Sequence, residues 1–242
     1  MKSDGQPLVR DTLQEAPLNK SDLNQRLRLL VITDTEVAGS RGLAYVLSEA
    51  LDAGAPAVQL RLKNSSAREM LEEARTLLPL VRATGALFTI NDRLDVALAA
   101  EADGVHLGPD DLPILDVRRS VPDEFIIGCS VDTLDGARKA EAEGADYLGV
   151  GTVYPTENKP DAGDVIGLSG LRQVAEAVDI PVLGIGGITP ERASDIAGAG
   201  ACGAAVIGAV MGAQDPAAAV RALLSPFGGA CVEVTVKPKL LS

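Results

Sequence analysis

The chain has 242 residues, of which 46% are hydrophobic and only 2% aromatic, so it suits one large domain with a core of small aliphatic side chains. Its formal net charge of −12 opposes binding to nucleic acid or to an anionic membrane over the surface as a whole, so a phosphorylated ligand must be held by a local cluster of cations, backbone amides or a metal. The sequence contains no apolar run of about 18 residues and no apolar signal-peptide segment, so we expect a cytoplasmic protein.

The three cysteines, Cys129, Cys202 and Cys231, are odd in number, widely spaced and form no CxxC pair. This pattern favours small buried residues in a reducing compartment over metal ligands or disulfides.

In chain order, residues 1–26 are polar, and we expect a loose arm with one helical turn at most. From Leu29 onward, short apolar runs alternate with helical patterns that end in glycine-bearing turns, and continuous apolar runs are typical of strands buried on both faces. The expected strands are Leu29–Thr33, Ala57–Leu62, Leu87–Ile90, Gly104–Leu107, Phe125–Cys129, Tyr147–Val150, Val182–Ile185 and Ala204–Ile207. The expected helices lie near 41–53, 66–83, 93–101, 113–119, 133–143, 168–178, 190–198 and 216–224.

Eight such units over residues 27–227 predict a single α/β domain, a closed (β/α)8 barrel. A doubly wound open sheet usually carries a glycine fingerprint after its first strand, whereas Thr33-Asp34-Thr35 stands there. Residues 228–242 form a C-terminal tail to which the sequence assigns no role.

Active sites of such barrels lie at the carboxyl ends of the strands, and the second strand carries cations there. Gln59, Arg61 and Lys63 share one face because side chains alternate along a strand. We interpret these three side chains as a row of polar and cationic groups that binds a pyrophosphate. The alternative is a solvated strand end with incidental charges.

Carboxylates follow the third and fourth strands. Asn91-Asp92 comes directly after one strand, and Asp111 lies in the loop after the next. Two carboxylates on neighbouring loops beside a phosphate site suit Mg²⁺, which prefers oxygen ligands. Each could instead cap a helix, Asp111 the one that starts near Pro113. As a pair they favour metal binding.

His106 is the only histidine, and it lies inside the fourth strand. A hydrogen-bonded core histidine is the favoured interpretation, and a single histidine argues against a zinc site or a Ser-His-Asp triad.

The loop after the sixth strand is long, and it carries Thr156 and Lys159. Such a loop is usually a lid or binding segment, although a tolerated surface insertion is the alternative. Glycines after the seventh strand and Ile207-Gly208 after the eighth predict a phosphate site formed by backbone amides. The alternative is that these glycines only tighten turns.

At these positions the chain resembles thiamine phosphate synthases, from about Leu30 to Leu224. The motifs that carry the resemblance are Gln59-Leu60-Arg61-Leu62-Lys63, Asn91-Asp92-Arg93, Asp103-Gly104-Val105-His106-Leu107-Gly108, Gly128-Cys129-Ser130, Tyr154-Pro155-Thr156 with Lys159, and Gly184-Ile185-Gly186-Gly187-Ile188.

The resemblance implies that 4-amino-2-methyl-5-hydroxymethylpyrimidine diphosphate reacts with a thiazole phosphate to give thiamine phosphate and pyrophosphate. It assigns the pyrimidine diphosphate to Gln59, Arg61, Lys63, Asn91 and Lys159. It assigns Mg²⁺ to Asp92 and Asp111, and it places Ser130 near the reacting centre. It assigns the thiazole phosphate to Thr156, Asn158, Gly187, Ile207 and Gly208. Arg61, Lys63, Ser130 and Lys159 are the expected catalytic residues, and Mg²⁺, Arg61 and Lys63 would neutralise the charge on the leaving pyrophosphate. Because the aminopyrimidine can stabilise the positive charge left at its methylene, no protein nucleophile is strictly needed.

Three positions depart from the family pattern. Asn158 replaces a threonine, and Gly208 stands where serine is frequent. Ser130-Val131-Asp132 stands where Ser-x-His is often seen, so Asp132 takes the place of the histidine. A thiazole tautomerase is a rival, but it uses a histidine at the position of Asp132. A non-catalytic paralogue that binds thiamine phosphate or a precursor is the other alternative. The sequence leaves the oligomeric state open, a homo-oligomer included.

Overall fold

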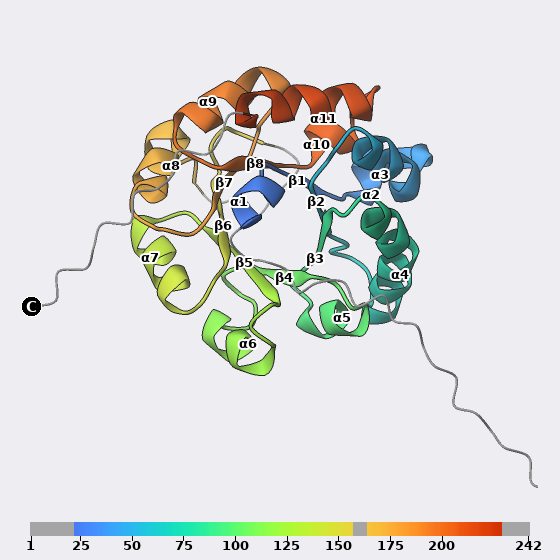
Figure 1. Cartoon of the computed structure of the whole chain (residues 1–242), viewed down its shortest axis with the longest axis horizontal. Coiled ribbons are helices and arrows are strands. Elements are labelled where there is room, and N and C mark those ends of the chain that lie inside the picture. Colours follow the sequence, from blue (N-terminus) through green and yellow to red (C-terminus); the bar gives the residue numbers. More distant parts are fainter. Residues whose placement is uncertain (1–21, 157–163, 229–242) are drawn as a thin grey trace, which may run out of the picture.

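The computed structural model of the protein describes residues 22–156 and 164–228. In these residues eight parallel strands form a closed ring in which each strand pairs with the next and β8 pairs with β1, so the predicted (β/α)8 barrel is confirmed (Figure 1). The strands are β1 (Leu29–Ile32), β2 (Ala57–Leu60), β3 (Leu87–Asn91), β4 (Gly104–Leu107), β5 (Ile126–Val131), β6 (Tyr147–Val150), β7 (Val182–Ile185) and β8 (Gly203–Val206).

Most helices surround this ring on the outside, whereas α1 lies across its middle (Figure 1). The α-helices are α1 (Leu23–Arg26), α2 (Thr35–Ala38), α3 (Leu43–Asp52), α4 (Ala67–Ala83), α5 (Leu94–Ala99), α6 (Ile114–Ser120), α7 (Leu134–Ala142), α8 (Gly167–Ala175), α9 (Ala193–Gly198), α10 (Gly208–Met211) and α11 (Pro216–Leu224). Short 3₁₀ turns are η2 (Gly39–Arg41), η3 (Pro190–Arg192) and η4 (Ser225–Phe227).

The core has two layers because side chains alternate along each strand. In β1, Leu30 and Ile32 belong to the cluster inside the barrel, whereas Leu29 and Val31 pack with the surrounding helices. All four are buried, which explains why the strands read as continuous apolar runs.

The turn α1 packs onto the barrel. Leu23 and Leu27 are buried and join the inner cluster, and Figure 1 shows α1 across the middle of the ring. The expected helical turn within residues 1–26 is therefore present, and its leucine belongs to the packed domain.

Several element boundaries differ from those expected. The strand β2 ends at Leu60 rather than Leu62, because the Thr33 side chain takes over the pairing with the backbone of Arg61. The strand β5 runs to Val131 rather than Cys129, since Ser130 and Val131 still pair with β6.

The helical segments near 41–53 and 190–198 are each subdivided. The first comprises η2 and α3, separated at Gly42, which has a φ of 74°. It is preceded by the unexpected α2, which Asp34 caps. The second comprises η3 and α9.

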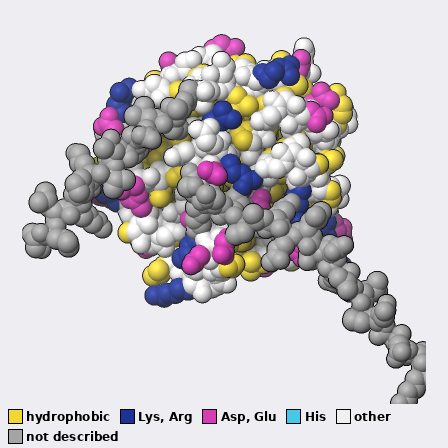
Figure 2. Space-filling view, in the orientation of Figure 1, with side chains coloured by type: hydrophobic (Ala, Val, Ile, Leu, Met, Phe, Trp, Pro, Cys, Tyr) yellow, Lys and Arg dark blue, Asp and Glu magenta, His cyan; other side chains and the backbone are white. Residues whose placement is uncertain are grey.

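The surface charges, the helices and the cysteines can each be compared with what the composition predicts. In Figure 2, acidic and basic side chains are interspersed on the described part of the face shown. Among the residues described, no helix combines the length and the apolar character that a membrane crossing requires. Cys129 and Cys202 are buried, as expected, and Cys231 lies outside the described residues.

Candidate active site

A cavity of about 400 Å³ lies at the carboxyl ends of the strands, where β2 to β8 and the loops after them all contribute lining residues. Ten of the predicted site residues line it, namely Arg61, Lys63, Asn91, Asp92, Asp111, Ser130, Thr156, Gly187, Ile207 and Gly208. Asn158 and Lys159 lie outside the described residues.

The polar side chains of the second strand lie at two depths. Arg61 and Lys63 line the cavity, whereas Gln59 is only 2% exposed inside the barrel. The Nε2 of Gln59 has no hydrogen-bond partner in the described part of the chain. The Gln59 side chain nevertheless lies beside the Tyr147 hydroxyl, where its contact acts to lower the Tyr147 pKa, and Gln59 is not among the described residues that line the cavity.

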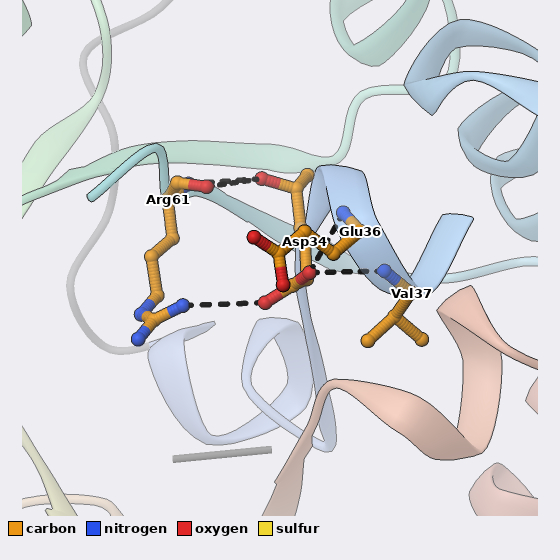
Figure 3. A network of polar contacts seen from close by, with 5 residues as sticks. Asp34, Glu36, Val37 and Arg61 are labelled. Atoms are coloured by element: carbon orange, nitrogen blue, oxygen red, sulfur yellow. Dashed lines mark hydrogen bonds and ion pairs between the residues drawn. The ribbon is translucent and has the colours of Figure 1, made fainter. Parts of the chain in front are cut away.

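Arg61 is held by the loop after β1. Its Nη1 lies 3.4 Å from the Oδ2 of Asp34, and its backbone is hydrogen-bonded to the side chain of Thr33 (Figure 3). Neither Thr33 nor Asp34 was expected to contribute to the site. The sequence shows only an acidic residue two positions after β1, and its contact with Arg61 depends on how β1 and β2 lie in space.

Asp92 and Asp111 do not act as the helix caps that were the alternative. The helix α5 is preceded by Arg93 and α6 by Pro113, and neither helix has a side-chain cap. Asp92 has a φ of 66°, a left-handed conformation that is uncommon for residues other than glycine. The Oδ2 of Asp111 accepts a hydrogen bond from the Gly108 N–H at 2.7 Å, within the same loop.

The two carboxylates lie side by side. Burial, followed by the hydrogen bond and charge of Asp111, raises the pKa of Asp92 to about 6, against the opposing effect of Lys63 and Arg61. A pair of close carboxylates that the neighbouring cations leave undercompensated fits a divalent cation. The described residues contain no group of three or more acidic, histidine or cysteine side chains arranged for a metal. Two carboxylates fit an ion that takes its further oxygens from water and phosphate, as Mg²⁺ does.

His106 links the cavity to the barrel interior. It is 6% exposed, with Nδ1 2.9 Å from the Tyr147 hydroxyl and Nε2 2.9 Å from the Ser130 Oγ. Burial raises the pKa of Tyr147, so this hydroxyl keeps its proton at neutral pH. The expected hydrogen-bonded core histidine is therefore present, and its second contact fixes the hydroxyl predicted to lie near the reacting centre.

The loops after β6 and β7 pack directly on each other. Gly187 has a φ of 59°, and a Cβ there would lie 2.5 Å from the Pro155 carbonyl oxygen, so only glycine fits. Arg192 donates to the Gly187 carbonyl at 2.6 Å and lies 4.5 Å from the centre of the Tyr154 ring. The Tyr154 hydroxyl also donates to Asp195 at 3.2 Å. The contacts of Tyr154 with Arg192 and Asp195 were not predictable from sequence, because they join residues about 40 positions apart.

Comparison with known proteins assigns the family. The model of the thiamine monophosphate synthase family matches residues 29–210. A thiamine-phosphate synthase of Roseiflexus castenholzii is 52% identical over 193 residues, which are 80% of this chain and 85% of that protein. One from Moorella thermoacetica is 50% identical over 195 residues, 81% of this chain and 93% of that protein.

A solved structure shows the same arrangement. The structure of a thiamine phosphate pyrophosphorylase from Pyrococcus furiosus is 46% identical to this chain, with a TM-score of 0.78. The match covers 86% of this chain and the whole of that one. These matches show that the chain belongs to the thiamine monophosphate synthase family.

Proposed function

We propose that the chain is a transferase that joins 4-amino-2-methyl-5-hydroxymethylpyrimidine diphosphate to a thiazole phosphate, with release of pyrophosphate and formation of thiamine phosphate. The relatives that are 52% and 50% identical bear the name of this activity. The observation that carries the proposal is one cavity in which Arg61, Lys63 and the pair of Asp92 and Asp111 face the same space.

The diphosphate binds at the ends of β2 and β3 in this proposal. Arg61 and Lys63 supply positive charge and Asn91 supplies an amide, all within the cavity lining. Gln59 lies below them inside the barrel and is assigned to the pyrimidine diphosphate on the family resemblance. We also assign Lys159 to the diphosphate, on the family resemblance.

The cavity lining favours a metal-bound diphosphate. Among the described lining residues two cations, Arg61 and Lys63, stand against the four carboxylates of Asp92, Asp110, Asp111 and Asp132. Such a lining would repel a bare diphosphate. Asp92 and Asp111 would hold Mg²⁺, which when bound supplies positive charge against the leaving group.

The reaction breaks the bond between the pyrimidine methylene carbon and the diphosphate oxygen. The electron pair leaves with the pyrophosphate, whose charge Arg61 and Lys63 stabilise. The aminopyrimidine delocalises the positive charge that remains, and the thiazole nitrogen attacks the methylene carbon. No protein nucleophile is consumed, so positioning and electrostatics do the work. Ser130, fixed by His106, lies in the lining where it contacts the departing group in this proposal.

The thiazole phosphate binds on the side of the cavity formed by the loops after β6, β7 and β8 in this proposal. Thr156, Gly187, Ile207 and Gly208 line that side, and α10 begins at Gly208. Backbone amides after β7 and β8 are the usual phosphate ligands of this fold. Asn158 would complete this set by family resemblance.

The direct test is a turnover assay with both substrates and Mg²⁺, in which pyrophosphate release and thiamine phosphate are measured together. We expect equal amounts of the two products, and no product after chelation of the metal or omission of either substrate. Tight binding of both substrates without turnover would replace this proposal with a non-catalytic paralogue.

A further inference from the structure

The loop after β1 carries an acidic residue whose two carboxylate oxygens have different partners. The Oδ1 of Asp34 accepts hydrogen bonds from the Glu36 and Val37 N–H groups, each at 3.0 Å, and so caps α2. Its Oδ2 faces the Nη1 of Arg61 at 3.4 Å (Figure 3). The side chain therefore joins the start of α2 to the guanidinium group.

The backbone of Arg61 is held by the preceding residue. The Oγ1 of Thr33 accepts a hydrogen bond from the Arg61 N–H at 2.9 Å and donates one to the Arg61 carbonyl oxygen at 3.3 Å. Thr33 is fully buried, so these bonds are shielded from water. Two consecutive residues of the β1 loop thus fix the arginine at its main chain and at the end of its side chain.

From this geometry we infer that Asp34 is a positioning residue for Arg61, and that it sets the orientation in which the guanidinium meets the diphosphate. The inference rests on the proposed function, because it assumes that Arg61 binds the diphosphate of the substrate.

Asp34 could affect the diphosphate in two opposite ways. Its negative charge weakens the attraction of Arg61 for an anion, whereas its contact restricts a flexible side chain to one orientation. Arg61 lines the cavity, and the described lining residues do not include Asp34, so the carboxylate stands behind the guanidinium as seen from the substrate. A guanidinium has five N–H donors, and one contact with Asp34 leaves others for phosphate oxygens. We therefore expect the orienting effect to dominate.

The substitution that isolates this role is Asp34→Asn. Asparagine caps helices as well as aspartate does, so α2 keeps its cap while Arg61 loses its charged partner. We expect kcat/KM for the pyrimidine diphosphate to fall about tenfold, the KM for the thiazole phosphate to change less than about twofold, and the melting temperature to stay within about 2 °C.

Asp215→Asn is the matched control. Asp215 is exposed and caps α11 through the Ala218 N–H at 2.8 Å, and no arginine in the described part of the chain pairs with it. Its replacement should leave both substrates' kinetic constants unchanged. An equal loss in the two variants would show that only capping matters and would overturn the inference.

A double-mutant cycle with Arg61→Gln tests the coupling directly. If Asp34 acts through Arg61, Asp34→Asn causes no further loss of kcat/KM once the guanidinium is gone. A tenfold loss in both backgrounds, or wild-type kinetics of Asp34→Asn alone, would overturn the positioning role.

Calorimetry with magnesium pyrophosphate separates this inference from the proposed function. We expect Asp34→Asn to weaken pyrophosphate binding about tenfold, by the same loss of orientation. Weaker binding in the variant together with a wild-type protein that makes no thiamine phosphate would sink the function and leave the positioning role standing. If the wild type makes thiamine phosphate but pyrophosphate binding is unchanged in the variant, the proposed function stands and the positioning role of Asp34 is overturned.

Discussion

An acidic residue between a barrel strand and the following helix is usually a helix cap, and the side chains of Asp92 and Asp111 show why that default fails in this protein. Asp92 adopts a left-handed conformation, and Asp111 bonds to the amide of Gly108 in its own loop. Both carboxylates are thereby left facing one cavity and one another. The pairing was predictable from two neighbouring strand ends. The role of Asp34 was not, because it depends on the distance to an arginine on another strand.

The variants Asp92→Ala and Asp111→Ala test the metal assignment. Each removes one oxygen ligand, so we expect magnesium-dependent turnover to fall about 100-fold or more, while the fold stays intact. Initial rates across a magnesium titration, with circular dichroism of each variant, measure both effects. Full activity in both variants would refute the assignment of Mg²⁺ to this pair.

The raised pKa of Asp92 predicts a pH-dependent stability in the metal-free protein. Its pKa is about 6 in the folded chain and near 3.8 as an ordinary carboxyl, so the folded state holds the extra proton between these values. The stabilising contribution of the protonated form is therefore complete at low pH and is lost as the pH rises through about 6.

The measurement is the melting temperature in a chelating buffer between about pH 4 and 7.5, compared with that of Asp92→Asn. We expect the variant to gain on the wild type as the pH rises, because it carries no buried carboxylate to ionise. Melting temperatures that change with pH in the same way in the two proteins would contradict burial as the cause of the raised pKa of Asp92.

At the scale of elements, apolar runs predicted every strand because both faces of each strand are buried. The ends were harder to predict, since they depend on partners from other elements. Thr33 replaces a strand residue in pairing with Arg61, and β6 extends the pairing of β5 to Val131. The four-residue helix α2 is shorter than the window over which a helical period can be recognised.

Because β5 and β6 pack closely, we expect Gly128→Ala to disturb the active site through the side chains inside the barrel. A Cβ at this position would lie 2.1 Å from the Tyr147 ring, whose hydroxyl contacts His106. The ring must move, and the His106 contact to Ser130 moves with it. We expect about 1–3 kcal/mol of destabilisation, which corresponds to a fall of roughly 2–12 °C in melting temperature, and a lower kcat.

The control for this substitution is Gly198→Ala at the end of α9, where an added Cβ meets nothing within 4 Å. This variant should melt at the same temperature or slightly higher, with unchanged kinetics, because alanine favours the helix. A Gly128→Ala protein that behaves like this control would show that the β5–β6 contact does not support the site.

For the molecule as a whole, the number of β/α units in the sequence was enough to predict a closed barrel. Eight such units in sequence order can pair each strand with the next and the last with the first. The packing of α1 on the ring depends on Leu23 and Leu27 reaching the inner cluster. A polar segment with two leucines gives no periodic signal strong enough to predict such a contact.

The net charge of −12 predicts an unusual dependence on salt. Both proposed substrates are anions, so the field of the whole molecule repels them, whereas Arg61 and Lys63 attract them only within the cavity. Salt screens the long-range field more than close, partly buried pairs. We therefore expect kcat/KM for the pyrimidine diphosphate to rise about two- to threefold between about 10 and 150 mM KCl at constant free Mg²⁺. A steep fall over the same range would mean that attraction at the cavity extends beyond its mouth and outweighs the charge of the surface.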